Sequence, residues 1–170
     1  LEHYVWSLPG ISNWFRGSRD RVTALIPKRL IDLWLEGKAP KLDDYVKAEP
    51  ADFEKDIKSA GFYRQKAKNI LAAAKIIKNK YHGNIPKTMK EMLTLPGVAR
   101  KTANVVLGNA YGVVEGIAVD THVRRLARLL GLTKETNPVK IEKDLMKIIP
   151  RKEWFNFTYR MIEYGRKYCP

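Results

Sequence analysis

Cysteine is almost absent from this 170-residue sequence, in which Cys169 is the only one. A single cysteine excludes an internal disulfide framework and cannot by itself hold a structural metal ion or an iron–sulfur cluster. Long apolar runs are missing too, because no stretch approaches the roughly 18 to 20 uncharged residues that span a bilayer. The first residues, Leu1-Glu2-His3-Tyr4, show no signal-peptide pattern, so we expect a protein of the cytoplasm, associated with the nucleoid, or of the nucleus.

Acidic residues are also scarce. The 18 aspartates and glutamates stand against 32 lysines and arginines, which gives a net charge of +14 and a pI near 9.9. A surplus of this size favours a polyanion as partner, and nucleic acid is the first candidate. Lysine-rich proteins of other kinds exist, so the charge has to be read together with a specific site.

Strand-type alternation is nearly absent as well, whereas apolar residues recur at spacings of three and four, which predicts an all-α fold. The length fits one domain, or two small lobes that share a core. Asp120 and Asn137 stand where helix N-caps belong, and Pro86 can open a short helix. The expected helices are 19–35 with a break at Pro27, 50–60, 64–81, 86–94, 100–111, 121–130, 139–149 and 153–168, with a turn at 37–42.

A Pro-Gly turn leads directly into a helix in the segment Leu95-Pro96-Gly97-Val98-Ala99-Arg100-Lys101-Thr102-Ala103. Such a turn leaves the first backbone N–H groups of the helix unpaired, at the positive end of its macrodipole. Phosphate binds at such a helix start, and the two basic residues there add charge. The segment therefore suits sequence-independent contact with a DNA backbone, although a plain turn between two helices with solvated basic residues is the alternative.

These residues carry a family resemblance. The run Leu-Pro-Gly-Val-Ala-Arg-Lys-Thr-Ala-Asn-Val-Val-Leu over 95–107, followed by Ala118-Val119-Asp120-Thr121-His122-Val123, resembles the helix-hairpin-helix and aspartate loop of the endonuclease III family of DNA glycosylases. Gly61-Phe62-Tyr63 with Lys66-Ala67, and Tyr164-Gly165-Arg166-Lys167-Tyr168-Cys169, resemble two further stretches of that family. The similarity covers roughly residues 48–169.

The resemblance implies an all-helical, two-lobed fold with the helix-hairpin-helix, residues 86–111, at the cleft. Residues 1–170 would form a single catalytic unit, with one lobe over about 12–113 and the other over about 1–11 plus 114–170. The expected partner is double-stranded DNA with a damaged base or an abasic site, bound by a monomer that flips the base out of the helix. The expected activity is removal of oxidised pyrimidines, followed by abasic-site β-lysis.

In that family the lysine at the position of Lys101 attacks the sugar C1′ and displaces the base. The resulting Schiff base allows strand cleavage by β-elimination. An amine attacks in its neutral form, so its surroundings must disfavour the ammonium form, as a helix N-terminus, Arg100 and burial would. The family's aspartate at the position of Asp120 helps to activate the nucleophile and opposes positive charge on the sugar. Helix capping alone is the other reading of Asp120.

The remaining site residues are expected to contact DNA. Ala99 replaces a glycine of the family's hairpin and needs a negative φ there. His122 could contact phosphate or only pack. Arg16 or Asn13 could fill the gap left by the flipped base. The residues that we expect to bind DNA are Leu95, Gly97, Ala99, Arg100, Thr102, His122 and Arg16.

Cys169 resembles the first of four cysteines that bind an iron–sulfur cluster in many family members. The other three are missing from this sequence, so no cofactor is expected within it. Cys169 would be a ligand of a 4Fe-4S cluster only if the full-length protein continues beyond Pro170.

Two other functions compete with the lyase. A monofunctional mismatch glycosylase of the same superfamily would use water in place of an amine, and Lys101 argues against it. A non-catalytic helix-hairpin-helix module would only bind DNA.

Overall fold

The computed structural model describes residues 41–58 and 61–168, and the described residues form helices and no strand. The predicted all-α fold class is confirmed, while the predicted helix 19–35 lies outside the described residues. Within the described part of the chain, no helix is long and apolar enough to cross a membrane. The chain divides into two compact units: the described residues of the first are 41–58, 61–86 and 94–97, and those of the second are 87–93 and 98–168. The predicted lobes, which divide near residue 113, stay a prediction.

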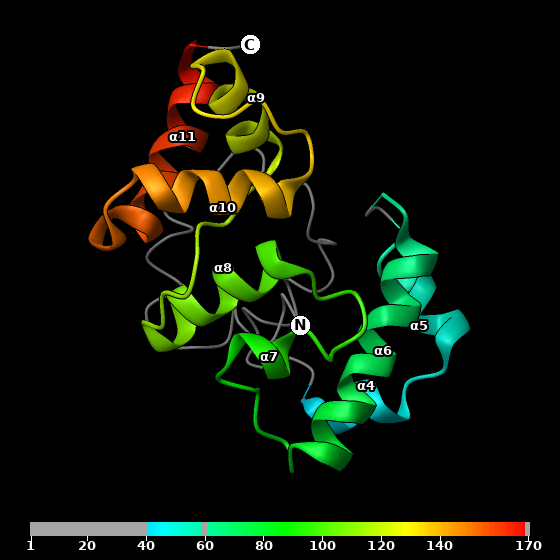
Figure 1. Cartoon of the computed structure of the whole chain (residues 1–170). Helices are drawn as coiled ribbons and strands as arrows, with labels where there is room; N and C mark the ends of the chain where they lie inside the picture. Colours follow the sequence, from blue (N-terminus) through cyan, green and yellow to red (C-terminus); the bar gives the residue numbers. More distant parts are fainter. Residues whose placement is uncertain (1–40, 59–60, 169–170) are drawn as a thin grey trace. The chain divides into compact units, whose positions relative to one another are not determined.

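The described residues of the first unit contain three helices (Figure 1): α4 (Leu42–Lys47), α5 (Pro50–Asp56) and α6 (Tyr63–Lys80). The two short helices both pack on α6, the longest of the described helices. Apolar side chains at spacings of three and four along α6 supply one side of the core. The buried cluster between the three helices consists of Tyr45, Phe53, Ile57, Ala67, Leu71 and Ala74.

The second unit contains α7 (Met89–Met92), α8 (Arg100–Tyr111), α9 (Thr121–Leu129), α10 (Pro138–Ile148) and α11 (Trp154–Tyr168). A 3₁₀ turn, η2 (Arg151–Glu153), precedes α11. Both α10 and α11 pack against α9 (Figure 1). The core of this unit consists of Ile117, Val119, Val123, Leu126, Ala127, Ile141, Leu145 and Met161. Two of these residues, Ile117 and Val119, come from the linker between α8 and α9, so this core fixes the linker as well as the helices.

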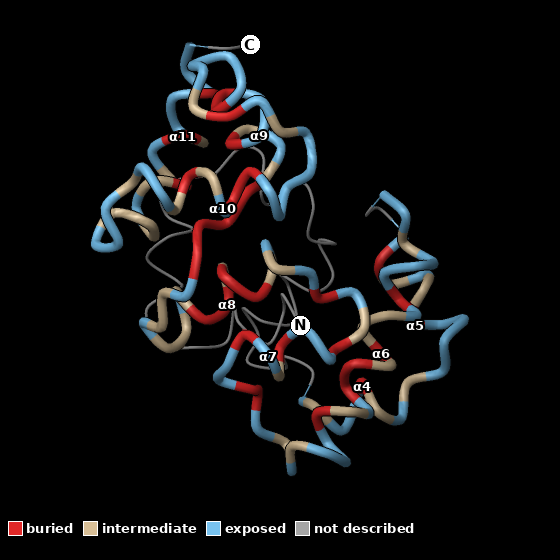
Figure 2. The backbone as a smooth tube through the Cα atoms, viewed as in Figure 1, coloured by how far each residue is buried: buried red, intermediate tan, exposed pale blue. Residues whose placement is uncertain are grey.

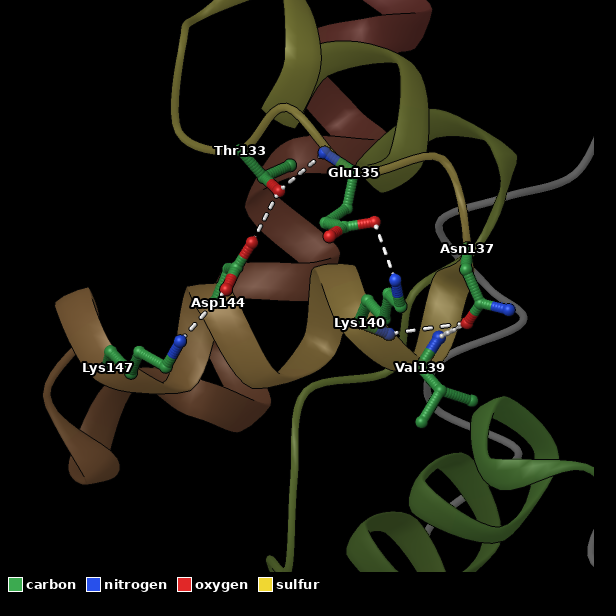
Figure 3. A network of polar contacts seen from close by, with 7 residues as sticks. All are labelled: Thr133, Glu135, Asn137, Val139, Lys140, Asp144 and Lys147. Atoms are coloured by element: carbon green, nitrogen blue, oxygen red, sulfur yellow. Dashed lines mark hydrogen bonds and ion pairs between the residues drawn. The ribbon is translucent and has the colours of Figure 1, made fainter.

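Side-chain caps set the starts of α9 and α10, as the sequence predicts. Asp120 accepts a hydrogen bond from the backbone N–H of Val123, and Asn137 accepts from those of Val139 and Lys140. Figure 3 shows the Asn137 cap and a further hydrogen bond, which the Thr133 hydroxyl donates to Asp144 on α10. The loop that joins α9 to α10 is therefore held at both of its ends.

Several predicted helix limits are wrong. The helix expected over 50–60 ends at Asp56, with Ile57 as its C-cap. The helix expected over 86–94 is the single turn α7, because Thr88 rather than Pro86 starts it: the Thr88 hydroxyl oxygen accepts from the N–H of Glu91 and the hydroxyl donates to its carboxylate. The turn expected at 37–42 ends where α4 begins, at Leu42, and this short helix has little apolar periodicity to reveal it.

Tyr45 in the core of the first unit generates a prediction about alkaline pH. Its ring meets Phe53 edge to face at 5.8 Å between centroids, and burial raises its pKa to about 12, with a smaller contribution from Asp44. In the unfolded chain a tyrosine ionises near pH 10, so between these values the unfolded state binds fewer protons and stability falls as pH rises. We expect Tyr45 to account for a loss of roughly 2 kcal/mol between about pH 9 and pH 12.

Urea unfolding of the native chain and of Tyr45→Phe at both pH values measures this loss. The stability advantage of the native chain over the variant should shrink toward high pH. Tyr168→Phe, at an exposed position, is the matched control and should show no such trend. An advantage of Tyr45 that is independent of pH would contradict the assignment.

Candidate active site

Lys101 lies in the first turn of α8, with its side chain exposed. Ala99 is the N-cap, in an extended conformation with φ of −92°, and it offers no side-chain acceptor to the first N–H groups of the helix. The negative φ is what the sequence requires of an alanine at this hairpin position. A 12-residue helix with an open N-terminus presents unpaired donors at its positive end, the arrangement that binds phosphate.

Gly97 makes the sharp turn before α8 and tolerates no side chain. Its φ is +75°, and a Cβ atom added there would lie 2.7 Å from Nδ2 and 2.9 Å from Cβ of Asn69 on α6. Leu95 is buried, at 2% exposure, and Gly97 itself is exposed. Both belong to the first unit, whereas Ala99, Arg100, Lys101 and Thr102 belong to the second.

Arg100 is engaged by a carboxylate within the second unit. Its Nε donates to Oε2 of Glu142 at 2.6 Å and its Nη2 donates to Oε1 at 2.8 Å. These hydrogen bonds raise the pKa of Arg100, while its partial burial acts in the opposite direction. The Glu142 side chain is only 3% exposed, so it is a buried charge with a bidentate partner. Part of the positive charge expected beside Lys101 is therefore neutralised, and contact of Arg100 with DNA stays a prediction.

Asn104 and Gly116 extend this arrangement. Asn104 Nδ2 donates to Glu142 Oε1 at 2.8 Å, and its Oδ1 is buried without a hydrogen-bond partner. A Cβ atom on Gly116 would lie 2.0 Å from Glu142 Oε1, so the linker backbone passes directly beside the carboxylate. The four residues 116–119 are all buried, as the red run of the tube after α8 shows in Figure 2. The Ala118 carbonyl also accepts a hydrogen bond from the Thr158 hydroxyl on α11 at 3.0 Å.

Asp120 follows this fixed linker and is half-buried. Its Oδ1 accepts from the N–H of Val123 at 2.8 Å, so the capping role that the sequence suggests is confirmed and uses one carboxylate oxygen. His122, two residues further along, lies with its ring against Gly165 of α11: a Cβ on Gly165 would be 2.9 Å from His122 Nδ1. His122 therefore packs between two helices, and its contact with DNA stays a prediction. Lys101 and Asp120 lie in the same unit.

Two residues stand out that sequence reasoning did not single out. Glu142 is one, and an acidic residue among the apolar positions Ile141 and Leu145 of α10 was the available signal. Phe62 is the other: it is 91% exposed and adopts φ of +57°, a left-handed conformation that bulky residues rarely take. An exposed aromatic ring held in this way before α6 is available for stacking.

Two expected site residues, Arg16 and Cys169, lie outside the described residues. In the ranges that the structure describes, no three His, Cys, Asp or Glu side chains form a group that could hold a metal ion. The chain's one cysteine cannot supply the four thiolates of a cluster.

The helix, tight Pro-Gly turn and uncapped helix of residues 89–111 define a helix-hairpin-helix protein. The sequence profile of the HhH-GPD superfamily of base excision DNA repair proteins matches residues 18–151. The chain belongs to this superfamily.

Curated relatives agree. The chain is 42% identical to endonuclease III of Bacillus subtilis over 147 residues, which is 86% of this chain and 66% of that protein. It is 54% identical to endonuclease III of Synechocystis over 118 residues, which is 69% of this chain and 54% of that protein. The resemblance read from the hairpin is confirmed, and the chain spans between about half and two thirds of the length of these relatives.

Solved structures give the same result. A trapped covalent endonuclease III–DNA intermediate matches with a TM-score of 0.76 and 42% identity, over 84% of this chain and 66% of that one. A non-covalent endonuclease III–DNA complex matches with a TM-score of 0.75 and 42% identity, over 82% and 65%.

The contact between Gly97 and Asn69 generates a prediction with a built-in control. Gly112, the C-cap of α8, has φ of +64° but nothing within 4 Å of an added Cβ. Gly112→Ala should therefore cost only the conformational penalty, about 1 to 2 kcal/mol. Gly97→Ala adds a clash and should cost at least about 1 kcal/mol more. Urea unfolding followed by circular dichroism measures both costs, and equal costs would show that the Asn69 contact is loose.

Proposed function

We propose that this protein is a bifunctional DNA glycosylase and abasic-site lyase that removes oxidised pyrimidines from double-stranded DNA. The observation that carries the proposal is Lys101, exposed at the open N-terminus of α8, in the same unit as the carboxylate of Asp120. Membership of a base excision repair superfamily and the 42% identity to a protein trapped covalently on DNA support it.

The Lys101 amine would act as the nucleophile. Its nitrogen attacks the sugar C1′, the glycosidic bond breaks, and the base leaves with the bonding electron pair. The amine then loses a proton, its lone pair forms the C=N bond as the C1′–O4′ bond breaks, and O4′ takes up a proton, which gives an iminium ion between Lys101 and the opened sugar. This cation withdraws electrons, so a proton can leave C2′ and the 3′-phosphate is eliminated.

Asp120 would serve the same reaction from the start of α9. One of its oxygens holds the cap of α9, which fixes the direction of the carboxylate. A carboxylate in this position opposes the positive charge that develops on the sugar as the base leaves, and it can accept a proton.

The open start of α8 would bind a DNA phosphate. Backbone N–H groups near Ala99 and Thr102 suit contact with the DNA backbone regardless of base sequence. The exposed Gly97 turn of the first unit would make a DNA contact of its own. Leu95 would support the turn from its buried position, and Arg100 and His122 would complete the interface. Phe62 would stack on a base when the duplex is opened, because an exposed aromatic ring does this without sequence preference.

Further parts of the proposal concern the whole protein. Arg16 would fill the gap that the flipped base leaves in the duplex. Cys169 would bind an iron–sulfur cluster only if further cysteines follow Pro170, and no step above uses such a cluster. We expect a monomer in the cytoplasm, associated with the nucleoid, or in the nucleus.

Covalent trapping with borohydride tests the nucleophile. The native chain, incubated with a duplex that carries an abasic site, should form an adduct that reduction makes permanent, because hydride reduces the iminium ion. Lys101→Ala should abolish the adduct. Lys90→Ala on α7, another exposed lysine of the same unit, should leave its yield unchanged.

The other outcomes separate the competing functions. A native chain that releases a damaged base without any adduct would be a monofunctional glycosylase. One that binds the duplex but does neither would be a DNA-binding module.

Two substitutions at Asp120 separate its two roles. Asn caps a helix as well as Asp, so Asp120→Asn should keep the stability within a few tenths of a kcal/mol, whereas Asp120→Ala should lose about 1 kcal/mol. Both variants lack the carboxylate and should release base at least about 100-fold more slowly in single-turnover assays. Native rates in the Asp120→Asn variant would leave capping as the only role of this residue.

A further inference from the structure

Glu142 ties together three segments of the second unit. It accepts two hydrogen bonds from Arg100, which stands directly before Lys101, and a third from Asn104 one turn further along α8. Its Oε1 also lies against the backbone of Gly116, closer than any side chain there would allow. The carboxylate on α10 thus meets both the start of α8 and the beginning of the linker that ends at Asp120.

Stability alone gives a poor account of this arrangement. Burying a carboxylate carries a large solvation penalty, and well-packed apolar residues in place of a buried ion pair are often neutral or stabilising. The network even leaves Asn104 Oδ1 buried without a partner, a further cost. What a bidentate buried pair supplies in return is direction, because planar groups with fixed donors and acceptors define one orientation of the helices that carry them.

This orientation of α8 relative to α10 matters for Lys101 and Asp120, the two side chains that the proposed reaction uses. Any rotation of α8 that keeps all three hydrogen bonds is small, so the first turn of the helix has one position relative to α10. The linker has little freedom either, because Gly116 rests on Glu142 and the Ala118 carbonyl is held by Thr158. Nucleophilic attack needs reacting atoms placed within a fraction of an ångström, and misplacement by about 1 Å can cost about 100-fold in rate.

We propose that Glu142 is a positioning residue that holds the first turn of α8, and with it Lys101, in one position relative to the linker that ends at Asp120. The inference rests on the proposed function for its catalytic consequence. Glu142 does not touch the substrate. It acts through Arg100 and Asn104 on one side and through Gly116 on the other.

Two variants perturb the network from opposite sides. Glu142→Gln keeps the shape but replaces one oxygen with an amide N–H₂, which faces donors of Arg100 or Asn104 instead of accepting from them. Gly116→Ala leaves every charge in place and pushes a methyl group against Glu142 Oε1. Asp144→Asn is the matched control: Asp144 also lies on α10 and accepts hydrogen bonds, but from Thr133 and Lys147 (Figure 3).

Single-turnover borohydride trapping at saturating protein is measured for each folded variant, well below its melting temperature, together with the Kd for a duplex carrying a tetrahydrofuran abasic-site analogue. Glu142→Gln and Gly116→Ala should both trap at least about tenfold more slowly, a larger factor than any change in Kd, because nucleophilic attack tolerates less displacement than the phosphate contact at the same helix start. Asp144→Asn should trap at the native rate. Native trapping rates in either folded network variant would overturn the proposal, since a merely structural role lowers the melting temperature without slowing folded molecules.

Amide hydrogen exchange gives a readout that does not depend on the reaction. Both network variants should exchange faster at residues 103–107, the first hydrogen-bonded amides of α8, and at residues 116–120. Exchange in α6, which belongs to the other unit, should stay at the native rate. A native chain that forms no adduct would refute the proposed function by itself. Amide hydrogen exchange alone would then test whether Glu142 fixes the position of the α8 start. Native exchange rates in both segments would overturn the proposal that Glu142 positions the start of α8.

Discussion

The ion pair between Arg100 and Glu142 is the constraint on which the geometry of the second unit depends. It joins the start of α8 to the middle of α10, and Asn104 and Gly116 pack on the same carboxylate. Apolar packing could hold these helices together, but it tolerates small rotations, whereas a bidentate pair does not. Arg100, the donor in this ion pair, directly precedes Lys101.

The helices of this unit differ in whether a side chain caps their first turn. At α9 and α10 the side chains of Asp120 and Asn137 satisfy the first N–H groups. At α8 the N-cap is Ala99, which has nothing to offer them. A helix start left open in this way is available to an anion from outside, and Gly97 lets the chain turn sharply in front of it. The proposed phosphate contact thus follows from what the local sequence leaves unsatisfied.

The elements with strong local signals were predictable from the sequence. The limits of α8 are as expected because a Pro-Gly turn precedes it and Gly112, in a left-handed conformation, ends it. The Asp120 and Asn137 caps were predictable for the same reason. The predicted start of α7 was wrong, because Pro86 and Thr88 both carry start signals and the reciprocal hydrogen bonds between Thr88 and Glu91 decide for Thr88.

The candidate site was predictable only in part. Lys101, Asp120 and the hairpin follow from local motifs, whereas the role of Glu142 depends on partners 38 and 42 residues away in sequence. No local pattern gives the direction of a side chain across such a separation. The charge of Arg100 illustrates the consequence: from the sequence it adds to the field at Lys101, and in the structure Glu142 compensates it. The backbone conformation of Phe62 was similarly hidden, since nothing in the residues around it requires a positive φ.

Locating the covalent bond to DNA shows which amine of this very basic chain is the nucleophile. The adduct formed with abasic-site DNA is reduced with borohydride, digested with nuclease and protease, and mapped by tandem mass spectrometry. The sugar remnant is predicted on Nζ of Lys101 and on no other lysine. A remnant on the N-terminal amine, or spread over several lysines, would contradict the assignment of Lys101 and of the α8 start as the reaction centre.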